Sequence, residues 1–295
     1  MHLLFGQFLL VFREALEAAL IIVVSLAYLK RTDKISLSRY VWYGVYVSVA
    51  VSLISGASVW FIYGSLTRSV KALFEGVAAL FAVLVLSSMI YWMATKGERL
   101  KREVERRVEA IVTRGTTLAM TSFSFTVVFR EGLETVLFLT PFLLNDAIGT
   151  LAGALLGVIA SSAIAYAIFI VGIKINMREF FYFSSILLVV LSGGLAGYGV
   201  HELVEYSEEM GVELGWLSEY AYDLNIPKDS PLHHNGAIGS IIAVMFGYTV
   251  SAEWARVIVH LAYLAIALPS IILIYRKQMC KHAIGKFCHL FSMKQ

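Results

Sequence analysis

The chain has little cysteine, proline or charge, and these shortages narrow the class of protein. Its only two cysteines, Cys280 and Cys288, lie close to the C-terminus, so no disulfide framework supports the fold. Four prolines in 295 residues leave room for long unbroken helices. Charged residues make up only 15% of the chain and hydrophobic residues 59%, which excludes an ordinary soluble domain. The composition therefore predicts an integral membrane protein.

Also missing is any series of short strands with alternating polarity, so a transmembrane barrel is not expected. Long apolar runs instead predict an all-α integral membrane protein that forms a single membrane domain over 1–295. We expect seven transmembrane helices, at about 3–29, 40–65, 71–95, 117–143, 147–173, 180–203 and 253–275. A shorter apolar stretch at 237–250 cannot cross a bilayer alone. We expect it to be re-entrant or interfacial, so that 237–275 holds this piece and the seventh span.

Basic residues in alternate connections predict the orientation in the membrane. The connection 30–39, the linker 96–115, the connection 174–179 and the tail 276–295 are rich in Lys and Arg. The positive-inside rule places these segments in the cytoplasm, with the N-terminus outside and the C-terminus inside a plasma membrane. The external loop 204–236 is strongly acidic. It either concentrates cations at the protein surface or is an ordinary solvated loop.

One phrase occurs twice, as VFREALEAAL at Val11–Leu20 and as VFREGLETVL at Val128–Leu137. Each copy lies inside a long apolar run, where an ionisable side chain costs about 2.5–3.5 kcal/mol on insertion scales. The copies fall in the first and fourth predicted spans, so each repeated unit holds three helices. An odd number of crossings inverts the second unit. We therefore expect a 3+3 inverted repeat, about 1–95 and 116–203, followed by a seventh span.

The charged residues of the phrase predict a cation site at the middle of the membrane. Residues three and four apart share a helix face, so the glutamates of each copy project together and each arginine reaches the second glutamate. Four carboxylates and no thiol make a site of hard oxygen ligands. The predicted metal ligands are Glu14, Glu17, Glu131 and Glu134, supported by Arg13 and Arg130. On this spacing Glu14 and Glu131 are the freer ligands; the alternative is that the ion pairs only fix helix packing.

Several other polar residues are candidates for an external cation-binding position. Glu75 begins the third span. There it either relays a cation or is stabilised by the helix dipole as an acidic residue near the helix N-terminus. His201, Glu202 and Glu205 lie at the external end of the sixth span. The adjacent pair His233 and His234 would diverge on a helix and is a weaker candidate. The tail residues Cys280, His282, Cys288 and His289 match no standard zinc spacing, so a basic tail at the lipid surface is the favoured interpretation.

The doubled Arg-Glu-x-x-Glu phrase resembles the high-affinity iron permease family, the oxidase-dependent iron transporters. Phe74-Glu75-Gly76 resembles that family's aromatic-Glu-Gly element, and Phe246-Gly247-Tyr248 resembles its Gly-Tyr element. The resemblance covers essentially the whole chain. It implies a permease that imports iron, with an external oxidase or iron-delivery protein as an expected partner. Fe³⁺ is the expected species because trivalent iron suits four carboxylates by charge, although Fe²⁺ would also bind them.

Other functions remain open from the residues alone. The same ligands suit another metal cation, such as Mn²⁺ or Pb²⁺. A membrane redox or proton-relay subunit could use the glutamates to carry protons, although paired histidines for haem are missing within the spans. We expect no catalytic residues, no permanently bound cofactor and no nucleic-acid partner. Iron would be the transported substrate, and the protein would be embedded in the lipid bilayer.

Overall fold

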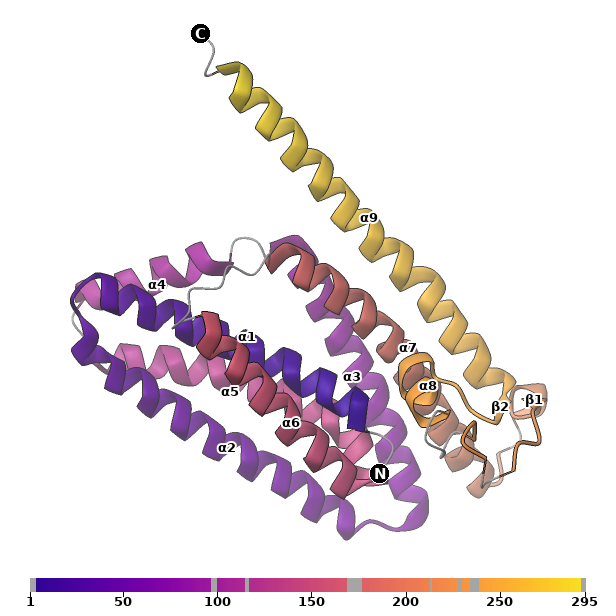
Figure 1. The fold of residues 1–295 in the computed structure, drawn as a ribbon. Coiled ribbons are helices and arrows are strands. Elements are labelled where there is room, and N and C mark those ends of the chain that lie inside the picture. Colours follow the sequence, from indigo (N-terminus) through magenta and orange to yellow (C-terminus); the bar gives the residue numbers. More distant parts are fainter. Residues whose placement is uncertain are drawn as a thin grey trace.

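A computed structural model describes residues 4–96, 100–114, 117–168, 177–212, 214–227, 230–233 and 239–292. Helices make up most of this part of the chain (Figure 1). They are α1 (Leu4–Arg31), α2 (Ser38–Gly64), α3 (Arg68–Lys96), α4 (Leu100–Arg114), α5 (Thr117–Asn145), α6 (Ala147–Tyr166), α7 (Met177–Glu209), α8 (Gly239–Phe246) and α9 (Trp254–Ser292). Two short strands, β1 (Tyr220–Asp223) and β2 (Ser251–Glu253), form an antiparallel pair.

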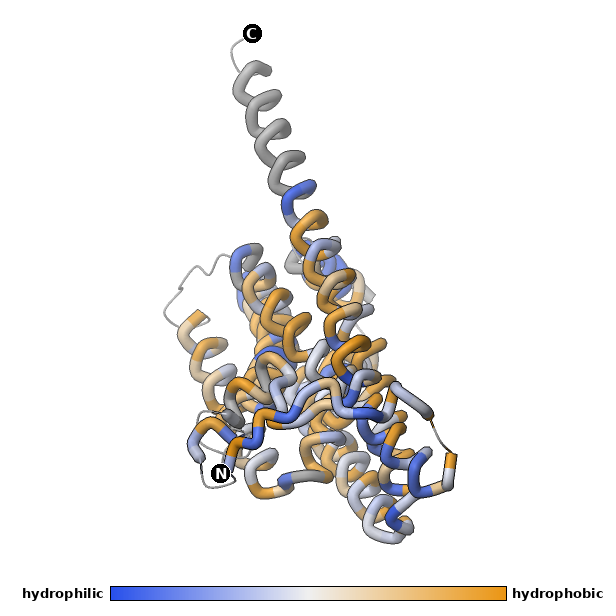
Figure 2. The backbone as a smooth tube through the Cα atoms, turned by 90° about the vertical axis from the view of Figure 1, so that its right-hand side faces the viewer, coloured by the Kyte–Doolittle hydropathy of each residue, from blue (hydrophilic) through white to orange (hydrophobic). Residues whose placement is uncertain are grey.

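Five helical segments in the described residues are long and apolar enough to cross a membrane: 35–64, 68–95, 147–166, 181–209 and 254–277. Helices α1 and α5 reach 28 and 29 residues, but each carries an Arg-Glu-x-x-Glu phrase within its apolar sequence. In Figure 2 the long helices are mainly hydrophobic, and hydrophilic residues concentrate at their ends and in the connections. The protein is therefore a multi-pass, helical membrane protein.

Small residues allow the central helices to approach each other closely. Helix α6 packs along α1, and α2 packs along α5. A Cβ atom on Gly157 of α6 would lie 2.8 Å from the Phe12 nitrogen, and one on Gly44 of α2 would lie 2.5 Å from the Thr121 oxygen. Membrane helices that lack bulky residues at such points gain from close backbone packing. Glycine at both positions thus sets the positions of α1 and α5, which carry the charged phrases.

Helices α1 and α5 run antiparallel. Leu29 near the end of α1 belongs to the same apolar cluster as Met120 near the start of α5. At the opposite ends, Leu10 of α1 shares a cluster with Phe138 of α5. The two charged phrases therefore meet between these clusters.

The structure adds elements that the sequence analysis did not anticipate. The predicted linker 96–115 contains α4, whose Val104 and Val108 are buried beside Ile21 and Leu29 of α1. Helix α7 continues to Glu209, beyond the predicted end of its span, and α9 continues to Ser292. The acidic connection after α7 contains β1, which pairs with β2 just before α9.

The stretch 237–250, expected to be re-entrant or interfacial, contains the short helix α8. Gly247 follows it with φ of +65°, a conformation that favours glycine. A Cβ atom at Gly247 would also lie 2.8 Å from the Cα of Gly194 in α7. This turn brings the chain back towards α7, so that β2 and the start of α9 lie beside the end of that helix (Figure 1).

Candidate metal site

Each arginine of the repeated phrase contacts both glutamates of its own copy. Arg13 Nη1 lies 2.7 Å from Glu14 Oε1, and its Nη2 lies 2.6 Å from Glu17 Oε1. In the second copy, Arg130 Nη2 lies 2.8 Å from Glu131 Oε1. The interpretation that Glu14 and Glu131 are free of arginine is therefore wrong, because each guanidinium is long enough to reach its neighbour in sequence as well as the residue one turn on.

The second copy is completed by a contact from Arg130 Nε to Glu134 Oε1, at 3.3 Å. Glu14, Glu131 and Glu134 each offer one carboxylate oxygen, and these atoms lie within 4.8 Å of one another. The structure thus brings oxygens from both copies together in these three residues. Glu17 is buried beside Arg13 and is not part of that three-oxygen group.

Glu14 and Glu131 are buried and Glu134 is partly buried, but all three keep oxygens available for a ligand. Glu14 is 1% exposed and Glu131 is 3% exposed. The second oxygens of Glu14, Glu131 and Glu134 have no hydrogen-bond partner among the residues that the structure describes. A buried carboxylate oxygen without a partner is costly, so a cation or water is the expected partner at this point. The group has the donor atoms of a hard-cation site.

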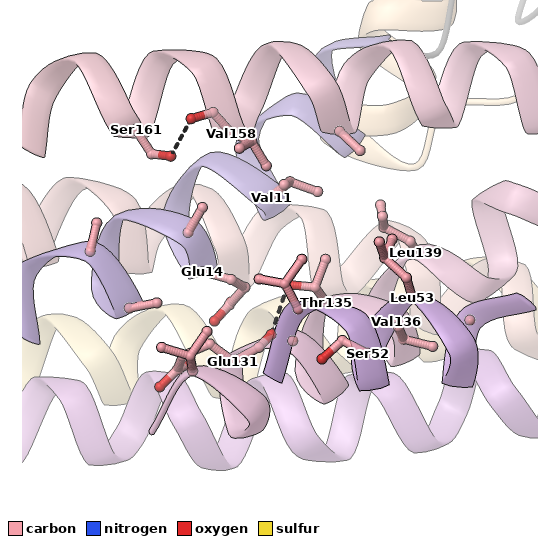
Figure 3. A pocket seen from close by; sticks show the side chains of 18 of the residues that line it. Val11, Glu14, Ser52, Leu53, Glu131, Thr135, Val136, Leu139, Val158 and Ser161 are labelled. Atoms are coloured by element: carbon pink, nitrogen blue, oxygen red, sulfur yellow. Dashed lines mark hydrogen bonds between the residues drawn. The ribbon is translucent and has the colours of Figure 1, made fainter. Parts of the chain in front are cut away.

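A cavity of about 1050 Å³ adjoins the glutamates, between α1, α2, α5 and α6. In Figure 3, the Glu14 and Glu131 side chains project towards each other at this cavity. Most of its wall is apolar, and hydroxyl groups are placed around it on Ser52, Thr135, Thr140, Thr150 and Ser161. The two glutamates thus lie where a largely apolar space meets the polar centre of the bundle.

The two arginines have unequal surroundings. Arg13 is 4% exposed, and its Nη1 lies 2.9 Å from the sulfur of Met89 in α3. The Arg130 side chain is 50% exposed, with its guanidinium carbon 5.7 Å from the centre of the Trp92 ring. Sequence reasoning missed Met89 and Trp92, because nothing local to these residues indicates that they face the repeated phrase.

Glu75, a candidate for the external cation position, is held by two tyrosines. The hydroxyl groups of Tyr63 in α2 and Tyr198 in α7 each donate a hydrogen bond to one of its carboxylate oxygens. The residue is buried and joins three helices. Both oxygens therefore already have donors, which favours a role in packing over direct metal binding.

The remaining external candidates come together at the end of α7. His201, Glu202 and Glu205 each offer one ligand atom, and these atoms lie within 4.8 Å of one another. Glu253 of β2, which the sequence suggested only as an ion-pair partner of Arg256, lies with its Oε1 3.1 Å from His201 Nδ1. Burial alone would raise the pKa of the Glu253 carboxyl, yet the hydrogen bond and charge of His201 hold that pKa below its ordinary value.

The other predicted histidine and cysteine candidates are not part of these groups. His233 is buried, and its backbone N–H donates to the Ser230 carbonyl at 3.0 Å. His234 lies outside the described residues. The side chains of Cys280, His282, Cys288 and His289 also fall outside the description, so the basic tail at the lipid surface stays a prediction.

Comparisons with known proteins identify the family of this chain. The model of the iron permease FTR1 family matches residues 4–275. A protein of Archaeoglobus fulgidus, described only as uncharacterized, is 44% identical over 88% of this chain and 91% of its own length. The ferrous iron permease EfeU of Yersinia pestis is 31% identical over 92% of this chain and 93% of its own.

The EfeU protein of an Escherichia coli O6 strain is 30% identical over 92% of this chain and 96% of its own length. No solved structure matches the chain at a significant level. The range matched by the family model includes both copies of the charged phrase and the end of α7. From its doubled phrase to its last apolar helix, the chain belongs to the iron permease FTR1 family.

Proposed function

We propose that this protein imports iron across the cell membrane through a site made by Glu14, Glu17, Glu131 and Glu134. The observation that carries the proposal is the meeting of buried glutamate oxygens from the two copies of one phrase. Ionisable groups inside membrane helices are characteristic of ion pathways. The named relatives are iron permeases, which favours iron as the cation.

The proposal includes seven spans arranged as a 3+3 inverted repeat with one added helix. Helices α1 and α5 would then cross the membrane despite their charges, because those charges are paired within the bundle. Packing supports the repeat: α1 packs along α6 as α5 packs along α2, while α3 packs along α7. Gly44 and Ser48 of α2 are buried with the same spacing as Gly157 and Ser161 of α6. The proposed orientation has the N-terminus outside.

Charge favours ferrous iron as the transported species. Four carboxylates and two guanidinium groups leave a formal charge of two minus, which one Fe²⁺ ion balances. The arginines then act as counter-ions that hold the glutamates in place until the cation arrives. The Y. pestis and E. coli relatives are named ferrous iron permeases, which agrees with this choice. The Fe³⁺ expected from the sequence is the alternative, together with an external oxidase to supply it.

The test is uptake of radiolabelled iron by proteoliposomes that contain the full chain. We expect Glu14→Gln and Glu131→Gln each to reduce uptake by at least about tenfold, since each removes one anionic ligand. Glu109→Gln, an exposed position on α4, is the matched control and should transport normally. Parallel assays with ascorbate-reduced iron and with ferric citrate separate the two oxidation states. Unchanged uptake in both glutamate variants would contradict the proposed site.

A competition assay separates iron from another metal as the substrate. Mn²⁺ and Pb²⁺ are the alternative cations, since both accept carboxylate oxygens. An excess of either should reduce iron uptake less than an equal excess of unlabelled iron. If Mn²⁺ or Pb²⁺ is transported faster than iron, the carboxylate site stands but its assignment to iron does not.

A further inference from the structure

A second group of possible metal ligands lies at the C-terminal end of α7. His201 and Glu205 are one turn apart on the helix, and Glu202 is next to His201 in sequence. One ligand atom from each lies within 4.8 Å of the others. This group is separate from the glutamates of the repeated phrase, because it is built from α7 alone. Its donors are one imidazole nitrogen and two carboxylates.

Glu253 orients the histidine from the neighbouring strand. The antiparallel pairing of Tyr220 in β1 with Glu253 in β2 fixes the backbone at this point. Glu253 Oε1 lies 3.1 Å from His201 Nδ1, which leaves Nε2 as the nitrogen for a metal ion. Metal-binding histidines commonly give their other nitrogen to a carboxylate in this way.

Burial adds an independent sign that a ligand belongs here. Glu253 is 8% exposed, and its Oε2 has no hydrogen-bond partner in the described part of the chain. A buried carboxylate oxygen without a hydrogen-bond donor, on a residue that contacts His201, is costly unless a cation or water is bound close by. Two arginines adjoin this group. Arg256 of α9 interacts electrostatically with His201, Glu202 and Glu253, and Arg68 of α3 lies with its Nη2 3.4 Å from Glu205 Oε1.

We infer that His201, Glu202 and Glu205 bind a divalent transition-metal ion before it reaches the glutamates of the repeated phrase. Neutral imidazole with two carboxylates carries two negative charges, which matches a divalent ion. The nitrogen donor favours Fe²⁺, Co²⁺ or Zn²⁺ over Ca²⁺ and Mg²⁺, which prefer oxygen ligands alone. We call the group of His201, Glu202 and Glu205 the outer site. That it binds the ion before the repeated phrase does rests on the proposed import of iron, whereas metal binding at the outer site does not.

Arg68 acts at the outer site as a displaceable counter-ion. Its guanidinium is largely exposed and also lies 3.1 Å from Glu209 through Nε. An arriving metal ion competes with it for Glu205. Removing this arginine should therefore tighten metal binding. Tighter binding could not be caused by misfolding, which would weaken it.

The test uses the full chain with Glu14→Gln and Glu131→Gln together, so that binding to the repeated phrase is lost. Co²⁺ is the probe, because its visible absorption reports nitrogen ligation. We expect one equivalent of Co²⁺ to remain bound. Adding His201→Ala or Glu205→Gln should weaken this binding by at least about tenfold, and Glu253→Gln by about 10–100-fold. Glu208→Gln, exposed on the same helix, is the matched control.

Two further results decide the inference. Arg68→Ala should tighten Co²⁺ binding by about two- to fivefold, the range for loss of an exposed ion pair. Excess Ca²⁺ should leave the Co²⁺ spectrum unchanged. The absence of Co²⁺ binding in the double glutamine protein, or full binding after His201→Ala, would overturn the outer site. If instead Co²⁺ binds as expected but the double glutamine protein transports iron normally, the proposed function fails and the outer site stands.

Discussion

At the scale of single residues, two arginines pair with four glutamates and leave a formal charge of two minus. Both oxygens that Arg13 contacts lie within 2.7 Å of its guanidinium, and neither glutamate of that copy is more than slightly exposed. Breaking a buried ion pair by removing one partner leaves an uncompensated charge, which costs more than the pair contributes. The arginines are therefore needed for the fold whenever the site holds no cation.

Arg13→Ala should lower the free energy of unfolding by about 3–5 kcal/mol, because it leaves Glu14 and Glu17 buried without a counter-ion. Arg130→Ala should cost less, since that side chain is half exposed. Thermal unfolding in detergent measures both, with the exposed Arg31→Ala as control. Adding Fe²⁺ or Mn²⁺ should restore part of the stability of Arg13→Ala. Equal losses for the two motif arginines would contradict the stated difference in burial.

The hydrogen bonds to Glu75 provide a second test at this scale. Tyr63→Phe and Tyr198→Phe should each destabilise the protein by about 1.5–3 kcal/mol, the range for a hydrogen bond to a charged group. Iron uptake per folded molecule should change little, because both tyrosines support packing. Unfolding and uptake are measured on the same preparations. A loss of uptake with unchanged stability would instead make Glu75 a ligand on the iron pathway.

The six charged positions of the site could be predicted because the phrase is written twice and lies in apolar sequence. Their contacts could not. The arginines reach both glutamates of a copy, which depends on side-chain rotamers rather than on spacing. Met89, Trp92 and Glu253 are brought to the two metal-ligand groups by tertiary packing, and no local pattern marks them.

At the scale of helices, α2 and α6 present small residues to α5 and α1, the helices that carry the charged phrases. Their buried residues recur every three or four positions and are mostly glycine, serine or alanine. This pattern lets the backbones of α1 and α5 approach closely, as in other membrane helix pairs with small residues at the interface. The sequence predicted these helices from hydropathy. It did not reveal α4 as a packed helix, because its charged face outweighs Val104 and Val108 in an average over the segment.

Gly157→Ala and Gly44→Ala should each destabilise the bundle by about 1–3 kcal/mol, because the added methyl group overlaps the backbone of α1 or α5. The control is Gly64→Ala at the end of α2, where nothing lies within 4 Å of the new atom. Thermal unfolding and iron uptake are measured together. We expect uptake to fall with stability for the first two variants. A loss as large for the Gly64 variant would show that close packing is not the cause.

At the scale of the whole molecule, hydropathy predicted a helical membrane protein, and the apolar helices confirm this class. The number of spans was predicted from the apolar runs, and their direction from the charges of the loops and from the doubled phrase. Both stay predictions. The strand pair beside α7 could not be predicted, because its strands are four and three residues long and distant in sequence.

The proposed orientation is tested with single cysteines in a chain whose Cys280 and Cys288 are replaced by serine. A cysteine at Ser218, in the connection before β1, should react with a membrane-impermeant maleimide added to intact cells. A cysteine at Glu109 on α4 should react only after the membrane is opened. The opposite pattern would invert the topology and with it the direction assigned to the outer site.

The unequal surroundings of Arg13 and Arg130 have one more consequence. Nearly identical phrases occupy different environments in one chain, one closed over by Met89 and the other half open beside Trp92. On the proposed arrangement of two inverted halves, exchanging these environments would bury Arg130, expose Arg13 and turn the opening of the site to the other membrane face. We expect the arrangement described above to be one of two related conformations. In the second, Arg13 and Arg130 would exchange their environments.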